Sequence, residues 1–444
     1  MNLTFLNHAS HIVECEEFVF ITDPWLEGSA FNDGWKLLDQ STSNAAIINR
    51  LKLHNKQIFV WYSHEHSDHF AVPFLKQAKA SNLNLHVLFQ TTSDRRVVSF
   101  LKKENIQVSI LRNGERHTLG HDSCFRVWSW RSGDSFSVLD LNGFRILNLN
   151  DCIVSDDQDS LRVKELVGGG RDVPINLLFT QFGYASWCGN EDDSSRRMAE
   201  AQEKCERIAS QISVIKPEAT VLFASFAYFS HADNFYLNDQ QNTPATVRES
   251  AALAQHSKRI FFMKPNDRIS LNGSCLESLS GSTVTAERHW QALCAAVAAD
   301  SPNDVAVVSQ QSIELAFRKY KKRVSMNFLF LFSIAESCRY IRPLRIRIEN
   351  LGVVAQLSYV HSIRFDSDVH NFDLTMKGDV LLFTIERDYG FDSTSVNGRF
   401  RARDDASYVK AMYFFGPQNL LKNGFGAKAP LMTIKELYRL RRRM

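Results

Sequence analysis

Three histidines and an aspartate lie within six positions, in the stretch HEHSDH at residues 64–69, of a chain that holds only 14 histidines in 444 residues. The apolar segment QIFVWY (57–62) directly precedes them, and its branched and aromatic residues predict a β-strand. We therefore expect the four polar side chains on a loop at the end of a strand, where a rigid sheet holds them in place.

The spacing inside this stretch predicts a metal site. His64 and His66 are two positions apart, so their side chains point the same way from extended backbone. Asp68 and His69 stand where the chain turns toward the next predicted helix, and they are expected to approach a second point nearby. Imidazole and carboxylate ligands without a thiolate suit zinc, iron or manganese. The stretch thus predicts one or two divalent metal ions.

Further ligands have to come from other strand ends. Asp151 ends the apolar segment FRILNLND (144–151) and is a candidate to bridge two metals. His231 ends ATVLFASFAYFSH (219–231), which predicts a single strand, and it is a candidate for the second metal position. A single polar residue at a strand end, such as a histidine, is more often a surface or hydrogen-bonded residue than a metal ligand. Asp151 and His231 are therefore candidates only because the cluster at 64–69 needs further ligands.

Other residues are candidates to line a substrate cleft. They are His8, Tyr184 in the aromatic stretch FGYASW (182–187), and Tyr228. Aromatic residues at strand ends are more often part of the core, and that alternative remains open for them.

The chain is long enough for more than one domain. Its first half alternates short apolar strands with helices, including one predicted over 192–215, which indicates a layered α/β architecture. A Ser/Gly-rich stretch at 270–285 suggests a boundary. We predict a metal-binding domain over 1–280, a helical linker over 281–330 and a smaller α+β domain over 331–444, in which DVLLFTIER (379–387) is among the predicted strands. This last domain would cover the cleft, bind a hydrophobic ligand or join subunits.

Composition narrows the partners and the compartment. The formal charge of +3 is too small to indicate nucleic acid, and the basic runs at 318–323 and 439–444 are typical of solvated helix ends, so no nucleic-acid partner is expected. Eight cysteines without a CxxC pair, and an N-terminus without a signal-peptide pattern, predict a cytoplasmic protein. The longest apolar run (326–335) is too short for a transmembrane segment.

With ITDPWL (21–26) before HEHSDH, and Asp151 and His231 after it, residues 1–275 resemble the metallo-β-lactamase superfamily, whose signature is HxHxDH. The resemblance implies an αββα sandwich and metal-dependent hydrolysis. It also implies that Asp23 supports the histidine loop from behind the metal ligands.

Four segments carry a closer resemblance, to the catalytic part of the CMP-N-acetylneuraminate hydroxylases. More distantly they are similar to N-acyl-phosphatidylethanolamine phospholipase D and L-ascorbate-6-phosphate lactonase. The segments are ITDPWLEGSAFNDGWKLL (21–38), SHEHSDHFAVPFLKQ (63–77), ILNLNDC (146–152) and FASFAYFSHAD (223–233).

Two departures from these families matter. The hydroxylases carry a Rieske domain with Cys-x-His and Cys-x-x-His motifs, and neither motif occurs here, so an oxygenase of this type would need a separate redox partner. The superfamily also places a histidine ahead of the bridging aspartate, and residues 125–143 contain none. Asp134 is the nearest substitute ligand by position; His117 and His121 lie earlier, in a predicted turn.

Three functional hypotheses follow. The first is a hydrolase that uses a metal-activated water on an ester, lactone or phosphodiester, with a small anionic substrate such as a phosphorylated or nucleotide-linked sugar. Asp68 would be the proton acceptor if only one metal binds. The second is an iron-dependent oxygenase acting on a nucleotide-activated sugar. The third, which the missing histidine motivates, is a non-catalytic binding protein.

Overall fold

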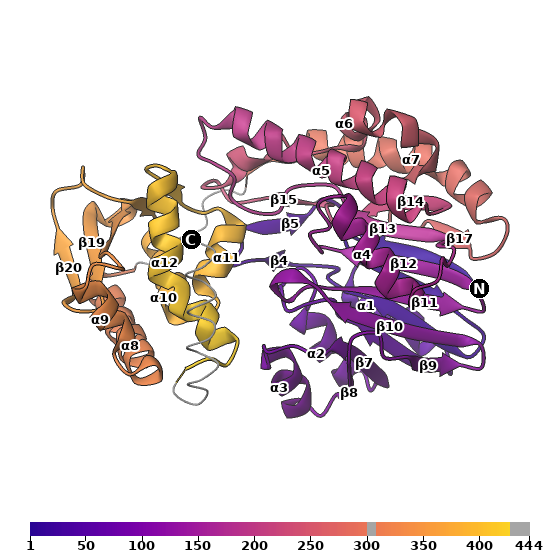
Figure 1. Ribbon diagram of the computed structural model, residues 1–444, viewed down its shortest axis with the longest axis horizontal. Coiled ribbons are helices and arrows are strands. Elements are labelled where there is room, and N and C mark those ends of the chain that lie inside the picture. The colour runs from indigo at the N-terminus through magenta and orange to yellow at the C-terminus, as the bar shows by residue number, and fades with distance from the viewer. Residues whose placement is uncertain (300–307, 427–444) are drawn as a thin grey trace.

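Two seven-stranded sheets pack face to face in the larger part of the molecule (Figure 1). The computed structural model describes residues 1–299 and 308–426, so the basic run at 439–444 lies outside the described residues. The first sheet has the order β17-β1-β2-β3-β6-β7-β8, and β3, β6, β7 and β8 run parallel. Its strands are β1 (Asn2–Asn7), β2 (Ser10–Glu14), β3 (Phe18–Thr22), β6 (Gln57–Trp61), β7 (Leu85–Gln90), β8 (Gln107–Leu111) and β17 (Arg268–Ser270).

The second sheet has the order β16-β14-β13-β12-β11-β10-β9. Its strands β12, β13, β14 and β16 run parallel, whereas β9 to β12 form antiparallel pairs. Its strands are β9 (His117–Gly120), β10 (Ser123–Ser129), β11 (Ser135–Leu141), β12 (Phe144–Asn150), β13 (Leu177–Gln181), β14 (Ala219–Phe223) and β16 (Ile260–Phe261).

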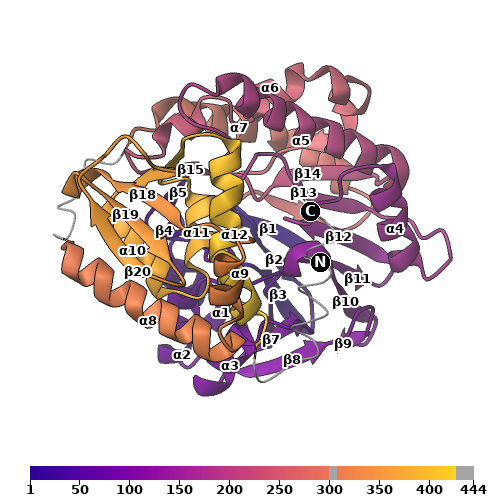
Figure 2. The ribbon, with the colours of Figure 1, turned by 60° about the vertical axis from the view of Figure 1, so that its left-hand side comes forward.

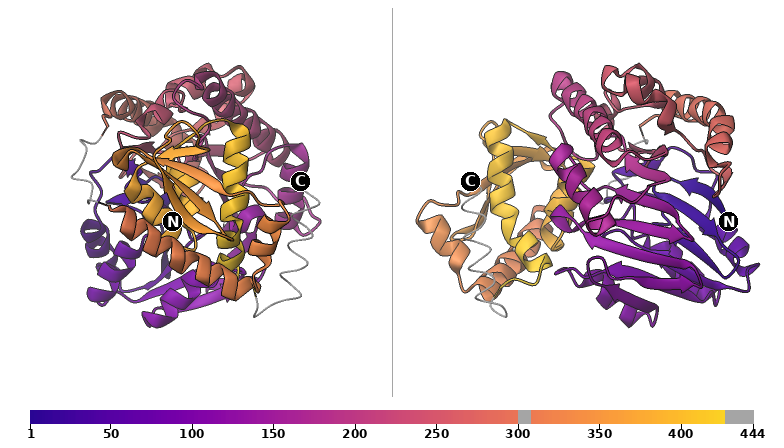
Figure 3. Two further views of the ribbon diagram at one scale, coloured as in Figure 1. Left: turned by 90° about the vertical axis from the view of Figure 1, so that its left-hand side faces the viewer. Right: turned by 45° about the vertical axis from the view of Figure 1, so that its right-hand side comes forward.

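Helices cover the outer faces of both sheets, as the right view of Figure 3 shows. The strands alternate their side chains between the two faces, so Phe20 and Trp61 point into the core between the sheets while Ile21 and Val60 meet the helices outside. The predicted αββα sandwich is therefore confirmed. The helices are α1 (Asn44–Lys52), α2 (Val72–Ala80), α3 (Arg96–Lys103), α4 (Asp157–Gly168), α5 (Ser194–Ile215), α6 (Pro244–Glu249) and α7 (Cys275–Ala296).

The prediction of one strand over 219–231 is wrong. Strand β14 ends at Phe223, and Ala224 has a positive φ of 51°, a backbone conformation that interrupts an extended strand. The chain then enters β15 (Ala227–Phe229), which pairs in a separate three-stranded sheet with β5 (Trp35–Leu37) and β4 (Ser29–Ala30). His231 is thereby carried away from the end of β14.

A smaller α+β region follows, with a five-stranded sheet of order β20-β19-β18-β21-β22, seen with α12 beside it in the left view of Figure 3. The segment 379–387, predicted as a strand, is mostly the helix α10, because a short apolar run fits a buried helix as well as a strand. The elements are α8 (Gln310–Phe328), α9 (Leu331–Ser337), β18 (Leu344–Ile348), β19 (Val353–Ser358), β20 (Ser362–Asp366), β21 (Leu374–Met376), α10 (Gly378–Glu386), α11 (Gly390–Asn397), β22 (Arg401–Ala402) and α12 (Asp405–Lys422).

The two helices of the predicted linker pack on different parts of the molecule. In α7, Trp290 stacks on Phe226 of the sandwich with ring centroids 3.9 Å apart. In α8, Phe317 belongs to the core of the C-terminal region. The domain boundaries at 280 and 330 stay a prediction. Among the residues that the structure describes, no helix is long and apolar enough to cross a membrane.

The C-terminal region docks on one end of the sandwich, with α11 on the side that faces β4 and β5 (Figures 1 and 2). Asn397 donates a hydrogen bond to the carbonyl oxygen of Phe31 at 3.0 Å, and its own carbonyl oxygen accepts one from Asn234 at 2.6 Å. Arg399 donates to the carbonyl oxygen of Asn32 at 3.1 Å. These contacts are buried or nearly so, and they fix α11 against the loops of the sandwich.

Candidate metal centre

The HEHSDH stretch forms a tight loop between β6 and α2, as the sequence predicts. The backbone N–H groups of His69 and Phe70 both donate to the carbonyl oxygen of His66, at 3.1 and 2.7 Å. This turn folds the loop back on itself. His64, Asp68 and His69 become buried, while His66 stays partly exposed.

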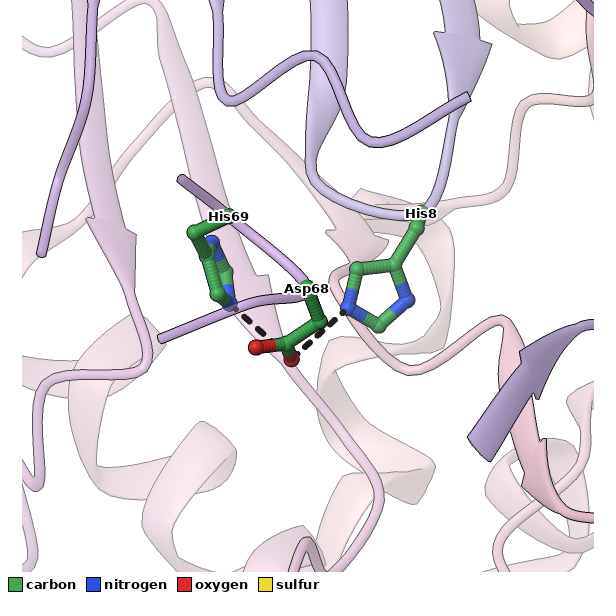
Figure 4. Close-up of side chains that lie close together, drawn as sticks. All are labelled: His8, Asp68 and His69. Carbon is green, nitrogen blue, oxygen red and sulfur yellow. Dashed lines mark ion pairs between the residues drawn. The ribbon is translucent and has the colours of Figure 1, made fainter. Parts of the chain in front are cut away.

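Two groups of potential ligands share His69. His69 Nε2 lies 3.4 Å from Asp68 Oδ2 and 3.3 Å from Asp151 Oδ2. His8, Asp68 and His69 make up one group, shown in Figure 4, with His8 Nε2 3.6 Å from Asp68 Oδ2. His64, His69 and Asp151 make up the other. Within each group the ligand atoms all lie within 4.8 Å of one another, so each can surround one ion.

The donor set fits a divalent metal ion. Several of its buried atoms have no hydrogen-bond partner among the described residues: both ring nitrogens of His8, Asp68 Oδ1, His69 Nε2 and Asp151 Oδ1. Buried polar atoms in proteins are nearly always paired, because an unpaired one has lost its water without compensation. A cation among these atoms would supply the missing partner, and imidazole with carboxylate is a ligand set for zinc, iron or manganese.

Asp23 supports the histidines from the opposite side. It follows β3, which lies next to β6, and its Oδ2 lies 3.1 Å from His69 Nδ1. Ser63 donates to both oxygens of Asp23, through its N–H at 2.8 Å and its hydroxyl at 2.7 Å, and Asn150 also donates to Oδ2. Because the Ser63 hydroxyl donates its proton to Asp23, its oxygen accepts a hydrogen bond from His64 Nδ1, at 2.9 Å. The Nε2 atoms of both histidines are left to face the cluster.

Electrostatics keep the carboxylates charged and His64 neutral. Burial, reinforced by the charges of His69 and His66, lowers the pKa of His64 to about 4. Burial acts to raise the pKa of Asp151, but the adjacent His69 outweighs it and the pKa falls to about 2. Likewise, burial opposes ionisation of Asp68, yet His69 and His8 hold its pKa well below the usual range. His64 is thus ready to bind a metal at neutral pH.

Two other histidines carry protons when no metal is bound. Burial acts to lower the pKa of His69, but the carboxylates of Asp68, Asp151 and Asp23 raise it well above the usual value. Burial also opposes protonation of His66, yet the negative charge of Asp392, 3.8 Å away, and that of Glu65 raise its pKa from 6.5 to about 9. A metal ion that binds these rings has to displace their protons.

We therefore expect zinc affinity to rise with pH up to about 9, because below that pH His66 is mostly protonated in the metal-free protein and has to lose its proton to bind a metal. Protons compete with the metal most strongly at neutral pH and less strongly as the pH approaches 9. Calorimetric titration in buffers of different ionisation enthalpy measures both the affinity and the number of protons released. An affinity that is constant over this range would contradict the assignment of protonated rings to the ligand set.

His231 lies outside both ligand groups. Its Nδ1 is 3.2 Å from Asp233 Oδ2, and Asp233 Oδ1 is in turn 2.7 Å from Lys377 Nζ of the C-terminal region. The break at Ala224 causes this displacement. The Ala224 N–H donates instead to the carbonyl oxygen of His8 at 2.9 Å. His8 sits in the left-handed turn between β1 and β2, with a φ of 37°, and this turn puts its ring beside Asp68.

The three candidates to replace the histidine that the superfamily places ahead of the bridging aspartate lie in different surroundings. Asp134 follows the 3-10 turn η1 (Arg131–Gly133). Burial raises its pKa to about 7, and the charges of His66 and Asp151 act on it, but it does not belong to either ligand group. His117 packs against the ring of Phe59, with centroids 5.8 Å apart, and the exposed His121 pairs with its neighbour Asp122.

The three predicted cleft residues line one small cavity. His8, Tyr184 and Tyr228 surround a space of about 20 Å³ together with Ser225 and Gln241. This volume holds about one water molecule and is far too small for a sugar nucleotide. The Tyr184 hydroxyl is already engaged, since it donates to the carbonyl oxygen of Leu237.

The contacts that sequence reasoning missed come from the C-terminal region. His66 Nε2 lies 3.8 Å from Asp392 Oδ2 of α11. Lys422, the last residue of α12, has its Nζ 2.6 Å from Glu65 Oε1 and 3.0 Å from Asp392 Oδ2. Neither Asp392 nor Lys422 belongs to a recognisable motif, and each is distant in sequence from the loop. No signal in a single sequence would have identified them.

Two sheets packed face to face between helices, with an HxHxDH loop at the end of a strand, define the metallo-β-lactamase fold, and this chain has that fold. It is distantly similar to the cytidine monophosphate-N-acetylneuraminic acid hydroxylases. Identity is 24% to the protein of Danio rerio over 264 residues, which is 56% of this chain and 42% of that one. It is 27% to the protein of Asterias rubens over 285 residues, 60% of this chain and 41% of the other.

The matched segment is less than half as long as either of these relatives. A protein of Homo sapiens, 22% identical over 61% of this chain and 54% of its own length, is named as an inactive form of the hydroxylase. No family model matches the chain.

Solved structures with similar architecture include two bacterial proteins. One is a possible metal-dependent hydrolase from Veillonella parvula, with a TM-score of 0.40 and 13% identity, covering 61% of this chain and 98% of the other. The second is zinc-bound PqqB from Methylobacterium extorquens, with a TM-score of 0.37 and 10% identity, covering 61% and 100%.

Proposed function

We propose that the protein is a metal-dependent hydrolase that cleaves an ester, lactone or phosphodiester. His64, His66, His69, Asp68 and Asp151 would hold one or two divalent ions, and His8 would take the role that the sequence suggested for His231. The observation that carries this proposal is the set of buried nitrogen and oxygen atoms around His69 that have no hydrogen-bond partner among the described residues. Such an arrangement is costly unless a cation completes it.

A bound divalent ion would polarise the substrate and lower the pKa of its water from about 16 to about 7. The residues of the chain have separate tasks. Asp68 stays ionised, and if only one ion binds, its Oδ1, which has no hydrogen-bond partner in the described structure, would be the proton acceptor. Asp23 and Ser63 keep the rings of His69 and His64 in the orientation that directs Nε2 toward the cluster.

A small anionic substrate suits the surroundings of the site. Lys204 of α5 is partly buried, with its Nζ 3.3 Å from Gln181 Oε1 and under the influence of the charge of Asp151. Burial and the neighbouring Arg207 lower its pKa to about 8, so it remains mostly a cation at neutral pH. A phosphorylated or nucleotide-linked sugar is the class of substrate that we propose. The eight free cysteines support the cytoplasm as its compartment.

Protein reconstituted separately with zinc, manganese or iron is expected to hydrolyse at least one member of a panel of phosphodiesters, lactones and carboxylic esters. His64→Ala should reduce the rate at least ~100-fold while circular dichroism shows an unchanged fold, and His121→Ala, at an exposed histidine, should not change it. Metal-loaded protein that hydrolyses no member of the panel would contradict the proposal.

The alternative is an iron-dependent oxygenase acting on a nucleotide-activated sugar. The similarity to the hydroxylases favours it, although it extends over less than half of the Danio rerio protein. This alternative predicts oxygen uptake by the iron-loaded protein when a reduced ferredoxin and a CMP-linked sugar are supplied. Oxygen uptake that is independent of the sugar would contradict it, and metal binding without either activity would favour a binding protein.

A further inference from the structure

The ring of His66 lies between the metal cluster and the C-terminal region. His66 belongs to neither ligand group, but its Nδ1 is 2.9 Å from Nε2 of His64, which belongs to the second group. The Nε2 of His66 is 3.8 Å from Asp392 Oδ2. Phe31 packs against the same ring, with centroids 5.6 Å apart, and limits how it can turn.

The other two histidines of the loop also have a polar group behind one ring nitrogen, at hydrogen-bond distances of 3.1 Å for His69 and 2.9 Å for His64. His69 has Asp23 behind one nitrogen and the cluster in front of the other, and His64 has Ser63 behind it. A carboxylate behind a metal-binding histidine fixes the ring and makes it a better donor. In the case of His66 the carboxylate comes from α11, a helix of the C-terminal region.

Asp392 is itself held in place by the chain. Lys422 Nζ bridges Asp392 Oδ2, at 3.0 Å, and Glu65 Oε1, at 2.6 Å, and Glu65 lies between His64 and His66 in the loop. The side chain of Lys422 is only 10% exposed and that of Glu65 13%, so water screens the ion pair between them little. Arg96 of α3 adds to the contact by packing over the ring of Tyr389, 4.8 Å from its centroid.

We propose that Asp392 is a positioning residue that orients His66 for metal binding, so that the C-terminal region is an integral part of the metal centre. This rests on the proposed function, because it requires a metal at His64 and His66. Lys422 keeps Asp392 at the correct distance by joining α11, α12 and the histidine loop. The C-terminal region then does more than cover the sandwich, because removing the carboxylate of Asp392 lowers the metal affinity of the site directly.

Titration of the full-length, metal-free protein with cobalt(II) tests this proposal, because the visible absorption of cobalt reports the geometry of its ligands. Asp392→Asn, which keeps the shape of the side chain, is expected to weaken cobalt binding about 10- to 100-fold and to change the spectrum. Asp392→Glu should recover part of the affinity, and Lys422→Met should weaken binding to a smaller extent. Thermal unfolding of each metal-free variant shows whether it is folded.

Asp405→Asn is the matched control. Asp405 also joins the two parts of the molecule, through an ion pair of 2.5 Å with Arg196, but it does not contact the histidine loop in the described structure. It should leave both the affinity and the spectrum unchanged. Wild-type affinity and spectrum in both Asp392→Asn and Lys422→Met would overturn the positioning role while leaving the proposed function intact. A wild-type protein that binds no cobalt would overturn the proposed function, and this inference with it.

Discussion

Replacing His69 with alanine is expected to abolish metal binding at both positions. The ring is the one residue common to the two ligand groups, and its Nε2 lies within 3.4 Å of both Asp68 and Asp151. Replacing a residue that only hydrogen-bonds to a metal ligand typically lowers the metal affinity 10- to 100-fold. Loss of the shared ligand itself should therefore raise the dissociation constant for zinc by at least ~100-fold. Competition with a chromogenic chelator measures this change.

His117→Ala is the control for this substitution, because His117 packs against Phe59 and lies outside both ligand groups. It should retain the wild-type affinity for zinc. His69→Ala also leaves Asp23 without its imidazole partner, so its fold has to be verified by circular dichroism before titration. A folded His69→Ala protein with unchanged zinc affinity would show that the two groups do not form a metal centre.

The second prediction compares the metal content of variants at His8 and His231. His8→Ala is expected to remove the ion held with Asp68 and His69, which would lower the affinity at that position at least ~10-fold. His231→Ala should leave the metal content unchanged, because the ring pairs with Asp233 instead. Elemental analysis after gel filtration of both variants measures the difference. Loss of metal in His231→Ala but not in His8→Ala would support the assignment made from the sequence and contradict the one made from the structure.

The loop was predictable because its signals are local, whereas the supporting role of Asp23 was implied only by the resemblance to the metallo-β-lactamase superfamily. The strand β6, the HxHxDH spacing and the turn into α2 follow one another within about 25 residues, and alternation and turn geometry decide where each side chain points. Asp151 directly follows a strand that is next to β13 in a parallel pair, so its position at the edge of the sheet also follows from local pattern.

The position of His231 was not predictable in this way. One residue, Ala224, takes a left-handed conformation and ends β14, and this sends His231 toward Asp233 and Lys377. Alanine carries no signal for such a break, since glycine and asparagine are the residues that usually mark one. The helix α10 was missed because its apolar residues form one continuous run, without the spacing that separates a helix from a strand.

The contacts of Asp392 and Lys422 depend on tertiary structure alone. They arise from the docking of α11 and α12 on the sandwich, where Asn397 donates a buried hydrogen bond and Arg399 a partly buried one. No spacing rule relates these residues to a loop more than 300 positions earlier, and ion pairs of this kind give no pattern in a single sequence.

The metal content of the purified protein is the most direct test of the account. The protein would be prepared without chelators, reconstituted with zinc, manganese or iron, freed of loose metal by gel filtration, and analysed beside His69→Ala. One or two ions per chain in the wild type, and almost none in folded His69→Ala, is the expected result. A wild-type protein that retains no divalent metal after reconstitution would contradict the central claim that the atoms around His69 form a metal centre.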